Sequence, residues 1–134
     1  MNSDIMKIED IPNLGNSLKD IETKFKGKYI LKNYINSLDL LEYEIYIYSI
    51  ILKKPFKAKI SFGINTIMRE KSNQFCVSRR IEAPIQTAPE FIALFNKYYM
   101  PRESNVWGDN KGAVHKIKLD EYVNLVYVND DRYE

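Results

Sequence analysis

The sequence predicts an α+β domain in which a mainly antiparallel sheet of about five to six strands carries two helices on one face. Several segments alternate apolar and polar residues with a period of two, which is typical of half-buried strands. Two other segments repeat apolar residues every three to four positions, which is typical of amphipathic helices. With 134 residues, the chain is long enough to form one domain over residues 1–134 with its own hydrophobic core.

The first helix is predicted over Asn16–Phe25, where Leu18, Ile21 and Phe25 recur at helical spacing. The Gly15-Asn16 start suits an N-cap, and Gly27 is placed to end the helix as a C-terminal cap.

The second helix is predicted to begin at Thr87, because Thr87 and Glu90 have the spacing of a capping box and Pro89 is tolerated in a first helical turn. One apolar stripe follows, made of Phe91, Leu94, Phe95 and Tyr98. Pro101 is expected to stop this helix.

Strands are predicted over Lys28–Ile35, Leu41–Lys53, Lys57–Ile64, Gln74–Glu82, Ala113–Leu119 and Tyr122–Asn129. Asn36–Asp39 supplies turn chemistry after the first of them, and Lys54-Pro55 breaks the run after the second. In Leu41–Lys53 the odd-numbered residues are expected to face the core. The other set changes from glutamates through tyrosines to aliphatics, so the far end of that strand is expected to be covered on both faces.

Arg79 shares a predicted strand face with the apolar residues Phe75, Val77 and Ile81. An arginine in such a place usually lies at a strand end, with its stem buried and its guanidinium in water. It can also mark an anion site.

Few side chains are available for chemistry, since the chain has one histidine and one cysteine. No motif for zinc, phosphate or nucleophilic catalysis is present, so neither a cofactor nor a metal is predicted. Cys76 is expected to act as a small buried hydrophobe. His115 is expected at the surface. Acid–base catalysis would require His115 to meet an acidic partner from the set Glu103, Asp109, Asp120 and Glu121.

The segment Pro101–Gly112 is predicted as the longest loop, and it holds the single tryptophan. Long loops often carry function, and tryptophan with arginine is enriched in binding hot spots. The predicted partner-binding residues are therefore Arg102, Trp107, Asp109 and Lys111. The alternative, given equal weight, is that Trp107 folds back to plug the edge of the sheet.

Positive charge is concentrated in the middle of the chain, where residues 24–80 carry twelve basic and four acidic side chains. If these residues share one face, they form a candidate surface for anions or single-stranded nucleic acid. The residues of this candidate surface are Tyr46, Tyr48, Lys57, Lys59, Arg79 and Arg80. The plainer interpretation is a solvated lysine face, with the tyrosines covered by a helix.

These observations favour a small non-enzymatic domain that binds another protein. The chain has 17 isoleucines, 15 lysines and 12 asparagines, which suggests AT-rich coding and fits a mobile-element inhibitor, such as an anti-defence (anti-CRISPR) protein, or an immunity protein. The alternatives are a nucleic-acid-binding domain and a weak carboxylate-based hydrolase or nuclease. A lone cysteine and the lack of a leader or membrane segment predict a cytoplasmic, intracellular protein without membrane contact. The partner and the oligomeric state are not predicted.

Overall fold

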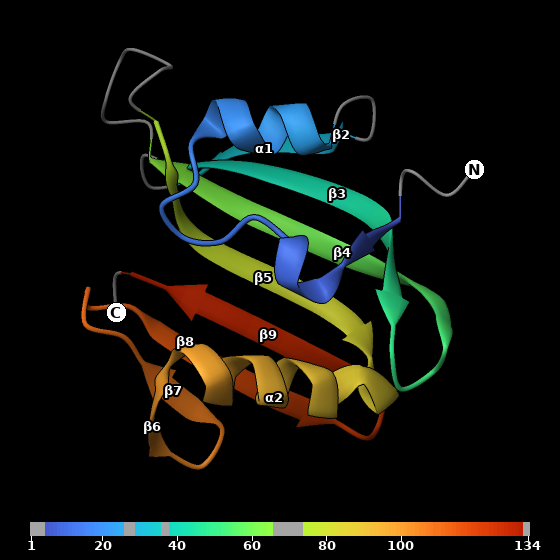
Figure 1. Cartoon of the computed structure of the whole chain (residues 1–134). Coiled ribbons are helices and arrows are strands. Elements are labelled where there is room, and N and C mark those ends of the chain that lie inside the picture. The colour runs from blue at the N-terminus through green and yellow to red at the C-terminus, as the bar shows by residue number, and fades with distance from the viewer. Residues whose placement is uncertain (1–4, 26–28, 36–37, 66–73, 133–134) are drawn as a thin grey trace.

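The computed structural model describes residues 5–25, 29–35, 38–65 and 74–132. These residues form one sheet with two α-helices packed against it (Figure 1). The strands are β1 (Met6–Lys7), β2 (Tyr29–Ile35), β3 (Leu38–Ser49), β4 (Lys54–Asn65), β5 (Cys76–Pro84), β6 (Met100–Glu103), β7 (Val106–Gly108), β8 (Val114–Asp120) and β9 (Leu125–Asp131). The helices are α1 (Leu18–Lys24) and α2 (Ala88–Tyr98), and short 3-10 turns cover η1 (Ile8–Asp10) and η3 (Ile85–Thr87).

Eight strands of the sheet follow the order β1-β3-β4-β5-β9-β8-β7-β6, and β2 pairs separately with β3. All described pairings are antiparallel except that of β1 with β3. The predicted α+β class and antiparallel character are therefore confirmed. The sheet is wider than predicted because β1 extends one side and because the expected loop after α2 forms two further strands.

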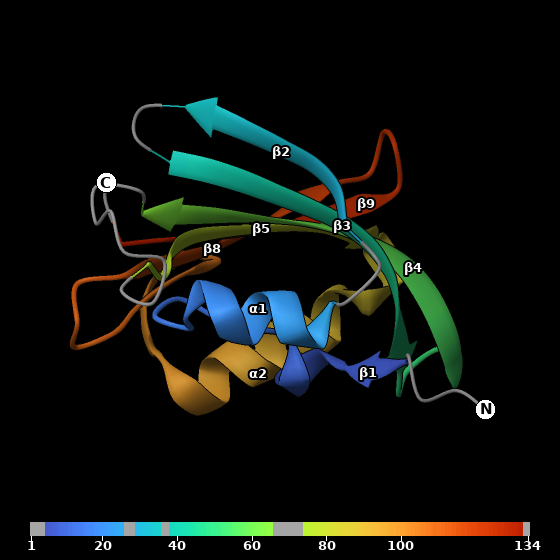
Figure 2. The same cartoon turned by 90° about the horizontal axis from the view of Figure 1, so that it is seen from above.

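Both helices lie on the same face of the sheet, and the opposite face is not covered by any helix of the described chain (Figure 2). The inner face of β3 and β4 follows the predicted alternation. The buried residues there are Leu41, Tyr43, Ile45 and Ile47 from β3 and Phe56, Ala58, Ile60, Phe62 and Ile64 from β4. These side chains join Phe25 of the α1 end and Phe91 and Phe95 of α2 in one core.

The far end of β3 differs from the prediction. The chain turns after Ser49, and Ile50 and Ile51 are 75% and 49% exposed instead of covered. Lys53 has a φ of 57°, a left-handed conformation that allows the tight turn into β4. Pro55 lies inside β4 rather than before it, at an exposed position of the strand. The β3–β4 hairpin bends toward the helix side of the sheet (Figure 2).

Both helices are confirmed with changes at their starts. Ser17 is the N-cap of α1, where its hydroxyl accepts a hydrogen bond from the Asp20 backbone N–H at 3.1 Å. The expected capping box of α2 is wrong, because the Thr87 hydroxyl donates to the Pro84 carbonyl instead of capping the helix. The predicted caps and turns at Gly27 and at 36–37 lie outside the described residues.

The predicted loop Pro101–Gly112 is largely a β-hairpin. β6 and β7 pair across a turn in which Asn105 has a φ of 59°, and β7 continues the sheet beside β8. The predicted strand at Tyr122 begins three residues later, at Leu125, since residues 121–124 form the turn between β8 and β9. Tyr122 is consequently 97% exposed.

Candidate functional site

A row of directly paired residues crosses the inner face of the sheet and contains three of the six polar or charged residues that are buried in the described chain. The register places Arg79 opposite Asp130, Asp130 opposite His115, and His115 opposite Trp107. On the other side Arg79 is paired with Phe62. Three polar side chains on three neighbouring strands are thus held side by side beneath the helices, each 5% exposed or less.

Asp130 lies at the centre of this row and connects two basic side chains. Its Oδ2 accepts a hydrogen bond from Arg79 Nε at 2.7 Å, and its Oδ1 lies 2.6 Å from His115 Nδ1. Arg79 Nη1 also donates to the Pro12 carbonyl at 3.0 Å. A buried charge is tolerated only when it is paired and hydrogen-bonded, and these contacts meet that condition. We refer to Arg79, Asp109, His115 and Asp130 as the buried charge network.

Asp109 joins the network from the turn between β7 and β8. Its Oδ2 lies 3.3 Å from His115 Nε2, while its Oδ1 accepts hydrogen bonds from the backbone N–H groups of Lys111 and Ala113 at 2.8 and 3.1 Å. Burial acts to raise the pKa of the Asp109 carboxyl, but the two backbone hydrogen bonds and His115 together lower the pKa below its ordinary value. Asp109 is therefore held in its charged form and fixes the turn.

Aromatic rings enclose the histidine. Tyr99 stacks on His115 with ring centroids 3.7 Å apart, and Phe95 meets His115 edge-on at 5.4 Å. Burial raises the pKa of the Tyr99 phenol, and the Tyr99 oxygen accepts a hydrogen bond from the Asn13 amide at 2.6 Å. His115 is only 1% exposed.

The expectation of a surface histidine is therefore wrong. His115 does meet acids, as catalysis would require, but both ring nitrogens face aspartates and stacked rings cover the ring. A cavity of about 360 Å³ between the 8–13 segment and α2 reaches Arg79 and Tyr99, and His115 is not among the described residues that line it. A general acid or base must lie within hydrogen-bonding reach of its substrate. In this geometry the described contacts of both His115 ring nitrogens are with side chains of the fold itself.

The predicted partner-binding residues do not form one surface. Trp107 is buried at 4% exposure, packs edge-on against Phe95 at 5.4 Å, and donates from its indole N–H to Asn96 Oδ1 at 2.8 Å. Trp107 therefore plugs the edge of the sheet, which was the predicted alternative to a role in partner binding. Asp109 belongs to the buried charge network. Arg102 and Lys111 are exposed, and the Arg102 guanidinium lies over Gly108, where a side chain would collide with it.

The predicted nucleic-acid residues are divided between the two faces. Arg79 is buried, so its guanidinium is not in water as expected. Tyr46, at 55% exposure, lies on the open face and not beneath a helix, whereas Tyr48, at 41% exposure, lines a groove that residues of α2 also line. Lys57 and Lys59 are also on the open face, where each is 3.2 Å or less from a glutamate of β3.

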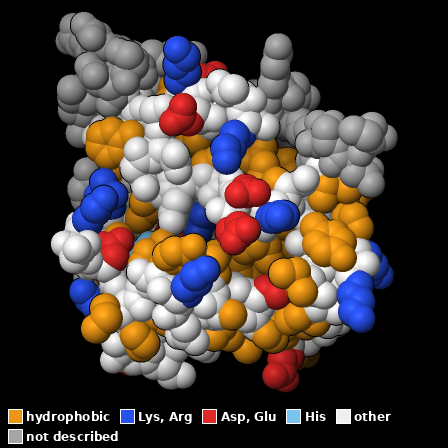
Figure 3. Space-filling model, viewed as in Figure 1, with side chains coloured by type: hydrophobic (Ala, Val, Ile, Leu, Met, Phe, Trp, Pro, Cys, Tyr) orange, Lys and Arg blue, Asp and Glu red, His pale blue; other side chains and the backbone are white. Residues whose placement is uncertain are grey.

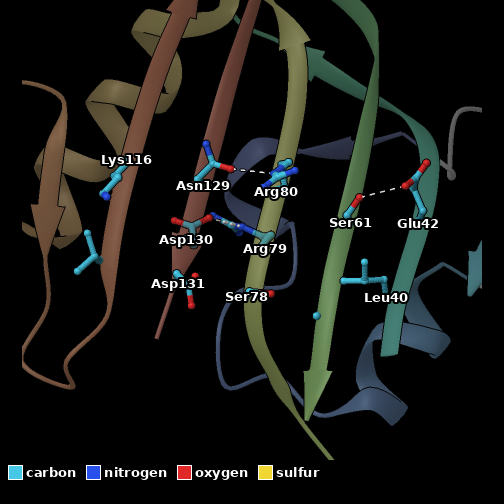
Figure 4. A pocket seen from close by; sticks show the side chains of 12 residues that line it. Leu40, Glu42, Ser61, Ser78, Arg79, Arg80, Lys116, Asn129, Asp130 and Asp131 are labelled. Carbon is cyan, nitrogen blue, oxygen red and sulfur yellow. Dashed lines mark hydrogen bonds and ion pairs between the residues drawn. The ribbon is translucent and has the colours of Figure 1, made fainter. Parts of the chain in front are cut away.

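The open face carries a shallow hollow of about 670 Å³ over β4, β5 and β9 (Figure 4). Its floor is low because the residues there are small, including Ser61, Gly63 and Ser78. Arg80 lines it, but its Nε donates to Asn129 Oδ1 at 3.0 Å. Basic and acidic side chains are mixed around this hollow, so it does not present the uniformly positive surface that an anion site requires.

An apolar groove of about 650 Å³ lies at the opposite end of the sheet from β6. Its walls come from the β3–β4 hairpin, the segment Lys7–Glu9 and the outer side of α2. The apolar residues that line it are Ile8, Tyr48, Ile50, Ile51, Pro89, Ala93 and Leu94. Hydrophobic side chains gather in this part of the surface, at the right of Figure 3, with Lys or Arg side chains at the margin. We call it the hairpin groove.

Glu90 holds the two walls of the hairpin groove together. Its Oε1 accepts a hydrogen bond from the Ile50 backbone N–H at 2.7 Å, and its Oε2 accepts one from the Ser49 hydroxyl. The Ser49 oxygen in turn accepts from the Leu52 N–H at 2.9 Å. The glutamate expected to cap α2 therefore fixes the hairpin turn to the first turn of the helix.

Cys76 is buried, and this burial raises the pKa of its thiol to about 12. Such a thiol is a poor nucleophile. Across the described ranges, His, Cys, Asp and Glu side chains do not gather in a group of three or more suited to a metal ion. None of the described helices has the length and apolar character needed to cross a membrane.

Comparison of the chain with protein-family models, with curated proteins and with solved structures gave no match. The function of this chain is therefore inferred from the geometry of the molecule.

Two features of the site were missed by sequence reasoning. Asp130 continues the i, i+2 spacing of the buried residues Val126 and Val128, which is a signal for an inward-facing acid, but the predicted strand ended one residue too early. The exposed position of Ile50 had no such signal, because the turn at Lys53 contains no glycine.

Proposed function

We propose that this chain is a non-catalytic module that binds another protein through the hairpin groove. The observation that carries this proposal is the exposure of Ile50 and Ile51 beside the apolar outer side of α2. Exposed apolar patches rimmed by polar residues are typical of interaction sites in soluble domains. Single exposed apolar residues scattered over the surface would not support this proposal, but Ile50 and Ile51 line one concave surface together with α2.

The contacts and burial of the potentially reactive side chains also support a binding function over catalysis. His115 has an aspartate on each ring nitrogen, and the Cys76 thiol is buried. The hairpin groove is fixed by Glu90, so a partner would meet a preformed surface and would lose little free energy in ordering it. Within this proposal, an intracellular inhibitor or immunity protein that blocks a site on its target remains the favoured role.

Site-specific photo-crosslinking tests the proposal. A benzophenone amino acid at Ile51 should give one discrete adduct with a protein in cells that naturally contain the chain. The same group at Lys118, on the open face, serves as a control and should give no such adduct. The captured protein, once purified, should bind the wild-type chain and bind the double variant Ile50→Glu, Ile51→Glu at least about tenfold more weakly.

Equal crosslinking from both positions would contradict the proposal, and so would equal binding of the double variant. The melting temperature of the variant should match the wild type, because both side chains are exposed. An unchanged melting temperature separates a loss of binding from a loss of folding.

A further inference from the structure

The lysines around the hairpin groove make no ion pair with a carboxylate of the described residues. Lys7 and Lys97 line the groove, and Lys53 and Lys54 follow Ile51 in the hairpin turn. All four are exposed, and within the part of the chain that the structure describes none of them has a carboxylate partner. Lys97 makes only a contact with the Tyr98 ring, at 5.3 Å from its centroid.

Two lysines of the open face are paired with glutamates instead. Lys57 lies 3.2 Å from Glu44, and Lys59 lies 3.0 Å from Glu42. The hydrogen bond with Glu42 and its charge raise the pKa of Lys59, as expected for a paired ammonium. Lys57 and Lys59 are thus compensated by glutamates of β3, whereas Lys53 and Lys54 in the hairpin turn have no carboxylate partner among the described residues.

The acidic residues of the groove cancel only part of this charge, because Glu90 and Glu9 carry two negative charges against the four lysines. The Glu90 carboxylate is also held by the hairpin, where both of its oxygens accept hydrogen bonds. Glu9 is the other acidic residue among the described groove-lining side chains. The hairpin groove therefore has an apolar floor and a net positive rim.

We propose that the hairpin groove binds an acidic amphipathic segment of the partner protein, with apolar side chains on the groove floor and carboxylates toward Lys7, Lys53, Lys54 and Lys97. This inference rests on the proposed function and names the chemistry of the partner. Complementary charge at a rim guides association and selects partners, while apolar contacts at the centre supply most of the affinity. The concave shape of the hairpin groove favours a protein segment over a membrane as its occupant, because protruding side chains are the groups that usually enter a membrane.

The test uses fluorescein-labelled amphipathic peptides of roughly 15 residues, long enough for about four helical turns. One peptide carries glutamates on its polar face, and its counterpart carries lysines on the same positions. Fluorescence anisotropy should show that the wild-type chain binds the acidic peptide at least about tenfold more tightly than the basic one. The difference should shrink as salt is raised from about 50 to about 300 mM.

Two charge-matched variants locate the effect. Reversal of Lys7, Lys53, Lys54 and Lys97 to Glu should weaken binding of the acidic peptide about tenfold or more and should favour the basic peptide. Reversal of Lys19, Lys111, Lys116 and Lys118 to Glu changes the net charge equally but lies elsewhere, and it should leave the preference for the acidic peptide in place. Circular dichroism confirms that both variants are folded.

Four results would overturn the inference: no binding of the acidic peptide, equal binding of both peptides, equal weakening by both variants, or preferential binding to phosphatidylserine vesicles through the groove lysines. Self-association that hides Ile51, seen by light scattering, would also overturn it. The crosslinking experiment at Ile51 is independent of these results. If a protein is captured there through a segment without acidic residues, the inference fails while the proposed function stands.

Discussion

Asp130 is the single side chain on which the buried charge network depends. It is 1% exposed and accepts hydrogen bonds from Arg79 on one oxygen and His115 on the other. Removal of one partner from a buried ion pair leaves the other charge without compensation, which usually costs far more than the net value of the pair. The network is consequently expected to govern whether β5, β8 and β9 assemble in register.

Asp130→Asn should therefore lower the free energy of unfolding by about 3–5 kcal/mol. Asparagine has nearly the same shape, so the loss would come from charge and hydrogen bonding and not from a cavity. Urea denaturation followed by tryptophan fluorescence measures it, because Trp107 packs next to the network. Glu121→Gln, in an exposed turn, is the control and should change stability by less than about 0.5 kcal/mol. A similar small effect from Asp130→Asn would show that the network does not stabilise the fold.

Asp109 makes the network sensitive to acid. The pKa of its carboxyl is lower in the folded chain than the value of about 3.9 expected in the unfolded chain. The carboxylate therefore stabilises the fold above about pH 4, and this contribution is lost as the pH falls through the lower folded value.

Asp109→Asn should be less stable than the wild type at pH 7, and the difference should shrink as the pH falls from about 4 to about 3. Urea midpoints measured across this pH range provide the comparison. Glu103→Gln, at an exposed position in β6, should show no such convergence. A difference that stays constant to about pH 3 would mean that the turn, and not the charge of Asp109, accounts for the effect.

At the scale of elements, the β3–β4 hairpin is attached to α2 through one residue. Glu90 accepts hydrogen bonds from Ser49 and Ile50, which are the last strand residue and the first turn residue of the hairpin. Hydrogen bonds to a charged acceptor contribute roughly 1.5–3 kcal/mol each when measured by mutation. The exposed hairpin tip is thus rigid at its base.

Glu90→Ala should release the hairpin without unfolding the helix. Stability should fall by about 2 kcal/mol, since alanine favours the helix slightly and offsets part of the loss. Amide hydrogen exchange should become faster at Ile50 and Leu52, while the amides of Phe95 and Tyr98 in α2 stay protected. Gln86→Ala, at an exposed position just before α2, should leave all four amides unchanged. Faster exchange throughout α2 would instead assign Glu90 a role in the helix itself.

The elements also show which parts of the fold the sequence could predict. Alternation identified the inner faces of β3 and β4, and the apolar stripe identified α2, because a sheet face and a helix stripe are local patterns. Arg79 was recognised as anomalous, but its partner could not be found. Pairing of β5 with β9 brings Arg79 to Asp130 across 51 residues of sequence, and strand order is a long-range property that local patterns do not encode.

Chain reversals were the least predictable elements. Lys53, Asn105 and Asn124 adopt positive φ angles at the turns of three hairpins. Asparagine is moderately common in that conformation, but lysine gives little warning of it. The expected long strand through Lys53 therefore ends early, and Ile50 and Ile51 become a surface where a covered strand end was expected.

At the scale of the whole molecule, the two faces of the sheet have different roles. The inner face is closed by α1, α2 and the buried charge network. The open face is polar and mixed in charge, with Lys57 and Lys59 paired to glutamates. Uncompensated positive charge and exposed apolar groups coincide at one end of the sheet, which is where a partner would gain most from contact.

This distribution of charge gives a prediction about nucleic acids. The proposed stacking residues Tyr46 and Tyr48 are exposed, but the cations beside them are compensated and Arg79 is buried. A fluorescent oligothymidine of about 20 nucleotides should therefore bind weakly even at about 50 mM salt, and Tyr46→Ala should not change its anisotropy. Tight binding that falls steeply by about 200 mM salt and is lost in Tyr46→Ala would favour the nucleic-acid alternative. In that case the glutamates of β3 would have to release their lysines to the phosphates.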